Sequence, residues 1–172
     1  VDQTFAYGGQ DGAAQYKVTG SRLTGQGPHS SFLIRTDMST NLYVLFAAFF
    51  TGQITRLDNF KVTAYNPDGV TDAQKFSSAT RAMIFVQGDS LQMDHIWASG
   101  AQTTTTVHIT DPSATPEPRN AVGIQFGSCT DTYMSNMFVE NCYYGYAFAS
   151  SIVSATNIEA FSTNGAAFAF GN

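Results

Sequence analysis

Apolar and polar residues recur along this chain at matched intervals, and the pattern predicts a repeating fold. A polar column has intervals of 36, 41 and 21 residues: Asn59, His95, Asn136 and Asn157. A column of phenylalanines precedes it by nine or ten residues: Phe49, Phe85, Phe126, Phe148 and, beyond the last polar residue, Phe170. The last two phenylalanine intervals give a bare repeat of about 22 residues, and the earlier two contain about 14 and 19 inserted residues. Periods of this length are typical of solenoids.

Residues around the polar column alternate with period two, which predicts β-strands. Apolar residues stand at positions −2, +1 and +3, as Leu57, Phe60 and Val62 do around Asn59. The alternation breaks at the polar residue, which predicts a tight bend, because Asn tolerates the left-handed conformation. His95 would take the structural place of Asn. Three short strands per repeat predict an all-β fold, a parallel β-helix with coils ~4.8 Å apart.

The interior of such a fold would be a stack of like residues. We expect phenylalanines on one wall, with Phe85 below and Phe148 above Phe126, and Leu, Met, Ile and Val on the others. Two long loops, Ala64–Thr80 and Gly100–Arg119, would be inserted between coils. Long loops on one edge of a solenoid commonly build a binding groove.

The expected organisation is a lead-in segment over residues 1–20 and β-helix coils over residues 21–172. The chain begins at Val1 without Met and stops at Asn172, directly after a core strand. A solenoid needs a cap at each end. We therefore expect a processed or truncated piece, with further coils following.

Composition and charge narrow the function classes. Hydrophobic residues make up 43% and charged residues only 12%, so many outward positions are Ser, Thr, Asn and Gln. A net charge of −5 with scattered Lys and Arg disfavours nucleic acid, which needs a basic patch. No apolar run reaches 18 residues, so we expect no membrane insertion. Cys129 and Cys142 are expected to be small, buried or half-buried thiols, and a disulfide is possible but not indicated. We expect no metal site and no cofactor.

Four carboxylates are candidate catalytic groups. Asp58 and Asp94 both stand one residue before the polar column, on consecutive coils. Two carboxylates so close should repel and raise one pKa, which is how a glycosidase keeps a protonated acid beside an ionised partner. The alternative is that each Asp caps the bend by accepting backbone N–H bonds. Glu140 and Glu159 are either further catalytic candidates or solvated surface residues.

Three outward residues point to carbohydrate binding. Lys61, Trp97 and Phe138 stand two residues after the polar column on successive coils. An exposed Trp beside carboxylates is a common platform for a sugar ring. Paired exposed aromatic residues also mark subunit contacts, so an interface is an equal alternative.

The outward face of the first strand is expected to be small and nearly uncharged. We assign to it seven residues: Ile84, Val86, Gln125, Gly127, Ala147, Ala149 and Ala169. Such a face suits close packing against another chain.

The segment Arg22–Ile34 resembles the opening coil of the pectate-lyase-like right-handed β-helix superfamily: an apolar residue, Gly-x-Gly, a Ser, then an apolar pair. Coils such as Thr55–Val62 are similar to the same superfamily. Bare coils mixed with long loops most resemble bacteriophage tailspikes and capsule depolymerases. The resemblance covers roughly Gln15 to Gly171. The Asp-rich motif that often precedes this coil is absent here.

The resemblance implies a right-handed coil, a homotrimer in a virion tail, and a bacterial surface polysaccharide that the full trimer binds and hydrolyses. Pectin-cleaving relatives perform metal-assisted elimination on the face of the first strand, and the lack of an Asp cluster there disfavours a calcium lyase. Two alternatives stay open: a secreted, extracellular bacterial polysaccharide-degrading enzyme (lyase or hydrolase), or an adhesive solenoid without catalysis. The sequence leaves open whether the chain is an enzyme.

Overall fold

A computed structural model shows an all-β chain. It describes residues 4–7, 14–19, 22–35, 43–49, 55–64, 82–100, 122–142, 144–149, 151–161 and 165–171. These residues contain strands and no helix: β1 (Thr4–Tyr7), β2 (Ala14–Thr19), β3 (Arg22–Thr24), β4 (Phe32–Arg35), β5 (Tyr43–Phe49), β6 (Thr55–Ala64), β7 (Ala82–Asp89), β8 (Leu91–Ser99), β9 (Val122–Glu140), β10 (Tyr144–Ala149), β11 (Ser151–Phe161) and β12 (Phe168–Gly171). The predicted all-β class is confirmed. Most of the two expected long loops lies outside the described residues.

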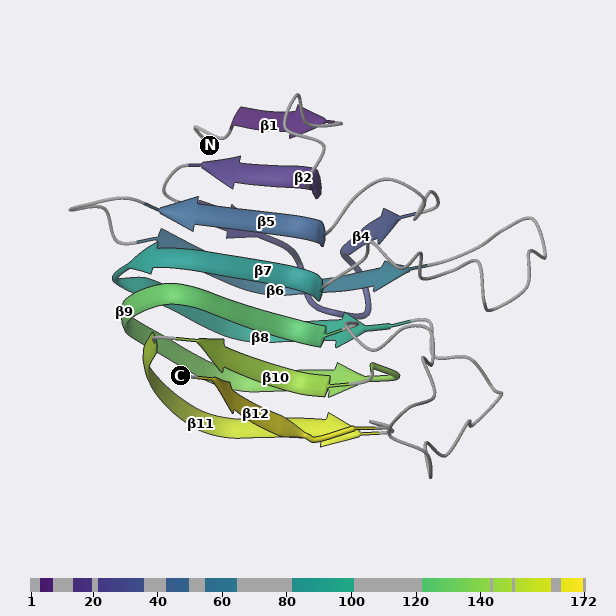
Figure 1. Cartoon of the computed structure of the whole chain (residues 1–172). Helices are drawn as coiled ribbons and strands as arrows, with labels where there is room; N and C mark the ends of the chain where they lie inside the picture. The colour runs from purple at the N-terminus through teal and green to yellow at the C-terminus, as the bar shows by residue number, and fades with distance from the viewer. Residues whose placement is uncertain are drawn as a thin grey trace.

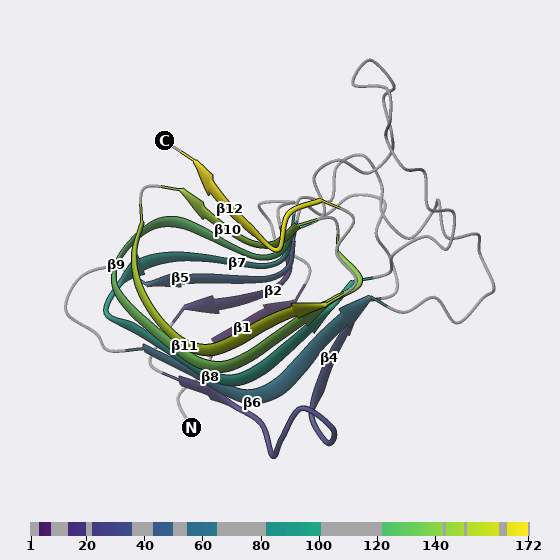
Figure 2. The same ribbon diagram turned by 90° about the horizontal axis from the view of Figure 1, so that it is seen from below.

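Strands far apart in sequence pair side by side, in parallel. Only β1 and β2 pair antiparallel among the described strands. One wall runs β2, β5, β7, the first part of β9, β10 and β12, and the other runs β3 and β4, β6, β8, the second part of β9 and β11. Figures 1 and 2 show the two walls enclosing a common interior, with β9 curving from one to the other. Pairing of β2 with β5 extends the first wall into residues 1–20.

The polar column forms a row of left-handed bends, as predicted. Each of its residues has a positive φ: Asn59 (61°), His95 (50°), Asn136 (52°) and Asn157 (51°). Parallel register places these bends beside one another, because Asp58 pairs with Asp94 before the bend and Phe60 with Ile96 after it. The Asn157 Nδ2–H donates to Asn136 Oδ1 at 2.7 Å. We call this row the Asn ladder; it divides the second wall into two faces.

We expect Asn136→Ala to lower the free energy of unfolding by roughly 2 kcal/mol, since Ala pays for the left-handed conformation and loses two side-chain hydrogen bonds. Those bonds are the contact with Asn157 and the one donated to Asp94 Oδ1 at 2.9 Å. Urea unfolding measures the loss. Asn136→Gly is the control, because Gly accepts the positive φ. Equal losses for Ala and Gly would mean that backbone conformation contributes nothing.

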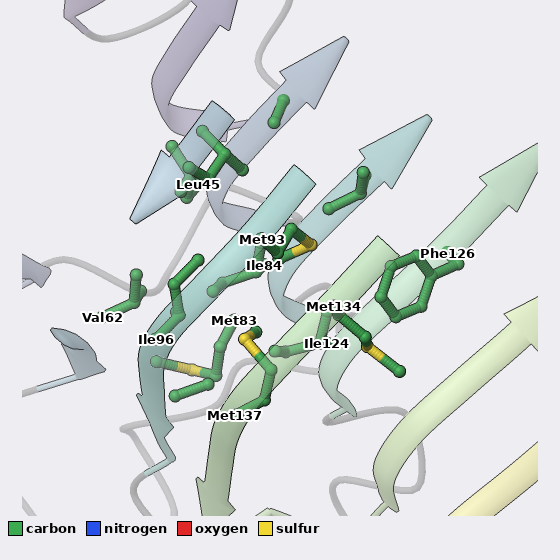
Figure 3. Close-up of a cluster of buried hydrophobic side chains, with 14 of the residues drawn as sticks. Leu45, Val62, Met83, Ile84, Met93, Ile96, Ile124, Phe126, Met134 and Met137 are labelled. Carbon is green, nitrogen blue, oxygen red and sulfur yellow. The ribbon is translucent and has the colours of Figure 1, made fainter. Parts of the chain in front are cut away.

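The core lies between the two walls. Figure 3 shows buried side chains meeting there from β5 to β9, including Leu45, Ile84, Met93 and Phe126. Like residues stack on like along the second wall, where Met93 pairs with Leu57 on one side and with Met134 on the other. The predicted interior of Leu, Met, Ile and Val is confirmed on this wall.

The phenylalanine column is correct for its last three members and wrong for its first two. Phe148 pairs with Phe126 and with Phe170, as predicted. Phe85, however, pairs with Gln125, and Phe49 pairs with Gly88. Long insertions separate Phe49, Phe85 and Phe126 in the sequence, so the spacing of these residues does not reveal the strand register. A shift of one residue moves a strand's side chains to the opposite face.

That shift corrects the outward face of the first wall. Ile84 and Val86, predicted to point outward, are fully buried. Val86, in place of Phe85, lies beside Phe126. The outward row consists of residues paired in register: Phe85, Gln125, Ala147 and Ala169. Phe85 is only partly buried and packs beside Ala82 and Val122. The face that was predicted to be small and apolar therefore includes a large aromatic residue, Phe85.

Candidate functional site

An open groove lies on the face of the second wall that follows the Asn ladder. Its lining residues come from β8, β9 and β11: Trp97, Phe138, Glu140, Glu159, Ala160 and Phe161. We call it the Trp97 groove. Parallel register forms its central row, in which Lys61 pairs with Trp97, Trp97 with Phe138, and Phe138 with Glu159. The structure thus brings together the three predicted carbohydrate-binding residues and two of the four candidate acids.

Trp97 is held by contacts on several sides. The Lys61 Nζ lies 3.6 Å from the centre of its ring, a cation–π contact. Phe138 and His29 meet the ring edge to face, with centroids 5.1 Å and 5.2 Å away. The Trp97 Nε1–H is buried and has no hydrogen-bond partner in the described part of the chain. Because Lys61 covers one face of the ring, the free aromatic surface of the groove comes from Phe138 and Phe161.

The two glutamates of the groove differ in their partners. Glu140 Oε1 lies 3.3 Å from Lys61 Nζ, and both side chains are mostly buried, with 19% and 16% exposed. Partial burial makes this ion pair less screened than a surface pair. Glu159 is exposed, and its side chain has no partner among the described residues. Glu159 pairs with Phe138 and Glu140 with Phe161, so the two carboxylates stand on neighbouring strands.

Asp58 is a fully buried carboxylate surrounded by donors. Its Oδ1 accepts hydrogen bonds from Thr24 Oγ1 at 2.5 Å and Asn59 Nδ2 at 3.2 Å. Its Oδ2 accepts from Arg56 Nε and from Arg22 Nη2, the latter at 3.4 Å. Burial raises the pKa of Asp58, but the bonds from Thr24 and Arg56 and the Arg56 charge outweigh it, so the net pKa is lowered.

Asp94 has its own set of donors. Its Oδ1 accepts from Ser135 Oγ at 2.7 Å and Asn136 Nδ2 at 2.9 Å, and its Oδ2 lies 2.8 Å from His95 Nδ1. Partial burial raises the pKa of Asp94, and the bonds from Ser135, Asn136 and His95 lower it by more. The expected rise in one pKa of the Asp58–Asp94 pair is therefore wrong, because each carboxylate is neutralised locally and both pKa values are lowered.

Asp58 and Asp94 stand apart from the Trp97 groove. Both precede the Asn ladder in their strands, whereas Trp97 and Phe138 follow it. The register itself is as predicted, with Asp58 beside Asp94. Their donors in the described structure are side chains, in place of the backbone N–H groups that the capping alternative named. Asp94 lines a separate depression on its own face.

The cysteines are free and buried, as expected. Burial raises the pKa of the Cys142 thiol to about 12, and its Sγ donates to the Glu140 carbonyl oxygen at 3.3 Å. A thiol of that pKa is a poor nucleophile. Within the described ranges, no three His, Cys, Asp or Glu side chains gather as metal ligands, and no helix has the length and apolarity to cross a bilayer.

Sequence reasoning missed two residues of this site. Phe161, 64% exposed, lies four positions after the ladder residue Asn157, in a column whose outward direction the pattern does show. His29 has no such signal, because only the packing of the segment between β3 and β4 brings its ring to Trp97. No family model, no curated protein and no solved structure matches this chain. The likeness to tailspikes accordingly remains a prediction.

Proposed function

We propose that this chain is a right-handed parallel β-helix from a bacteriophage tailspike, and that its Trp97 groove binds a bacterial surface polysaccharide. The observation that carries the proposal is the row Lys61, Trp97, Phe138 and Glu159 on four neighbouring strands. It combines aromatic surface with charged hydrogen-bonding groups in one open groove. Concave sites with apolar walls and a few oriented polar groups are typical of ligand binding.

The coiled fold is supported by three features of the described strands. Parallel pairing joins each strand to one from a neighbouring repeat, as β9 with β7 and β10. Left-handed bends recur once per repeat along the Asn ladder. Buried side chains stack on their counterparts, as Phe148 does between Phe126 and Phe170. Repeats that bury a core only against their neighbours are the mark of solenoids.

The groove chemistry suits a sugar polymer. Pyranose rings carry apolar C–H faces and rims of hydroxyl groups. Phe138 and Phe161 would contact the C–H faces, and the carboxylates of Glu140 and Glu159 would accept hydroxyl hydrogen bonds. An open groove, unlike a closed pocket, admits a chain at any point along its length.

Hydrolysis in the full homotrimer is the second part of this proposal. Glycoside hydrolases commonly use a pair of carboxylates on either side of the scissile bond. Glu140 and Glu159 are the pair in the Trp97 groove. Lys61 would orient Glu140 through their 3.3 Å contact, and Glu159 would be open to the substrate. The virion tail would be the site of action.

We expect Phe138→Ala and Phe161→Ala each to weaken polysaccharide binding about tenfold, which corresponds to roughly 1.4 kcal/mol. The probes are purified O-antigen and capsular polysaccharides printed as an array, followed by calorimetry on those that bind. Phe170→Ala is the matched control, since Phe170 is also exposed, at 80%, but belongs to the first wall. Failure of the unmodified protein to bind any array member would refute the proposal.

Cleavage is tested separately with Glu140→Gln and Glu159→Gln. If the pair is catalytic, each change abolishes cleavage of a polysaccharide that still binds. A non-catalytic adhesive module is the competing function. The lowered pKa values of Asp58 and Asp94 exclude these two carboxylates as protonated acids at neutral pH and leave Glu140 and Glu159 as the candidate pair. If a polysaccharide that binds the parent protein stays intact after long incubation, the non-catalytic adhesive function is supported. A monomer by light scattering would favour the secreted enzyme over the tailspike.

A further inference from the structure

A second depression lies on the other side of the Asn ladder. It is lined from β6, β8, β9 and β11: Arg56, Gln92, Met93, Asp94, Tyr133, Met134, Ser135, Ser154, Ala155 and Thr156. We call it the Tyr133 face. Register arranges the strand positions on this side of the wall in two rows across four neighbouring strands, and the Asp58 side chain is the buried member of the second row. One row is Arg56, Gln92, Tyr133 and Ser154, and the other is Asp58, Asp94, Ser135 and Thr156.

Tyr133 gives this face an aromatic surface. Tyr133 is 57% exposed, and its neighbours on both adjacent strands are polar. Gln92 precedes it in the row, and Ser154 follows it. A large exposed ring among polar groups is poorly suited to burying apolar protein surface. It is suited to a ligand that has both C–H faces and hydroxyl groups.

Unpaired hydrogen-bonding groups surround that ring. Arg56 uses its Nε–H on Asp58, and a guanidinium has four further N–H donors. Gln92, Ser154 and Thr156 are exposed, and their side chains have no hydrogen-bond partner among the residues that the structure describes. The face thus offers amide, hydroxyl and guanidinium groups that are free to bind a ligand.

The charges of the face cancel. Arg22 and Arg56 are balanced by Asp58, to which both are bonded, and by Asp94. Hydrogen bonds from Ser135 and Asn136 keep Asp94 in its ionised form. No net charge remains to select an acidic polymer such as nucleic acid, which is bound through excess Lys and Arg.

We infer that the Tyr133 face is a second saccharide-binding site, selective for uncharged sugars. A sugar ring lies on Tyr133, while Arg56 and Gln92 bond its hydroxyl groups from one side and Ser154 and Thr156 from the other. Four neighbouring strands span three spacings, ~14 Å in all. That length fits an oligosaccharide segment better than a single sugar.

This inference rests on the proposed function, since it assigns a second stretch of the same polysaccharide. β8 carries Gln92 and Asp94 on one side of the ladder residue His95, and Trp97 on the other. One polysaccharide chain that reached both sites would gain effective concentration at the second once the first was bound. Binding of the polymer would then be tighter than binding of its short fragments.

The test uses a neutral O-antigen polysaccharide that binds on the array, together with its oligosaccharide fragments. Tyr133→Ala and Gln92→Ala should each weaken polymer binding about tenfold. Titration calorimetry with the fragments should show two sites per chain in the parent and one in Tyr133→Ala. Phe170→Ala serves again as the control, and circular dichroism checks that each variant is folded. The affinity for an acidic capsular polysaccharide should be unchanged by either substitution.

The outcomes separate the two proposals. If Tyr133→Ala and Gln92→Ala leave polymer affinity and fragment stoichiometry unchanged while Phe161→Ala loses binding, the second site is refuted and the Trp97 groove stands. If only the Tyr133-face variants lose binding, the second site stands and the groove is refuted. If no polysaccharide binds the parent protein, both are refuted.

Discussion

Replacement of Phe126 by alanine is expected to destabilise the protein by about 3–5 kcal/mol, the largest effect of any single change proposed for this chain. Phe126 is fully buried. Its ring stacks on that of Phe148, with centroids 5.1 Å apart and planes 8° from parallel. Truncation would remove the buried ring, leave a cavity between Val86 and Phe148, and break an aromatic stack.

Urea unfolding of three variants measures this loss and tests the register. Phe170→Ala, at the exposed end of the same stack, should cost less than about 1 kcal/mol, because little area is buried there. Phe85→Ala should also cost less than Phe126→Ala, since Phe85 lies on the outer face beside Gln125. Equal losses at Phe85 and Phe126 would instead support the column that the sequence pattern suggests, with both rings inside.

The second wall could be predicted from sequence because its signals are local. Alternation around Asn59, His95 and Asn136 fixes which side chains point inward over a few residues, with no insertion between the bend and its flanking strands. The positive φ at each bend matches the residue types found there. Register then follows by aligning the bends, which places Lys61 beside Trp97 without any knowledge of distant contacts.

The register of the first wall is harder to predict from sequence because two of its strands, β7 and β9, follow long insertions. Phe85 and Phe126 share a residue type, and matching them shifted the strand by one position. In the structure the other register is found: Ile84 and Val86 are buried in the interior, and Phe85 lies on the outer face. Branched aliphatic residues and phenylalanine are both suited to a core strand, so residue type alone could not choose between the two registers.

The electrostatics of the site depend on contacts between strands that are far apart in the sequence. Asp58 was correctly placed beside Asp94, yet its pKa is lowered in part by a hydrogen bond from Thr24, which lies 34 residues earlier in the chain. Similarly, Lys61 was correctly placed beside Trp97, but its position over the ring and its ion pair with Glu140 come from side-chain packing. Sequence spacing predicts which backbones are neighbours, and it leaves open where long side chains reach.

Asp58→Asn is expected to lower the free energy of unfolding at pH 7 by roughly 2 kcal/mol, because hydrogen bonds to a buried charged group are stronger than neutral ones. Asn would keep the size of the side chain but lose the negative charge that Arg22 and Arg56 share. The exposure of both arginines, 57% and 44%, limits the loss, since their guanidinium groups regain water. Asp94→Asn is the comparison and should cost less, because the Asp94 side chain is 29% exposed.

The pH dependence of that loss identifies its cause. The pKa of Asp58 is lowered in the folded state relative to its ordinary value of 3.8. Its contribution to stability is therefore fully present above the unfolded pKa and is lost as the pH falls through the folded pKa. The gap between parent and Asp58→Asn should stay constant from pH 7 to about pH 5 and shrink below the unfolded pKa of about 4. A variant more stable than its parent at pH 7 would mean that the folded pKa is raised, as a protonated catalytic acid requires, and would return Asp58 to the catalytic candidates.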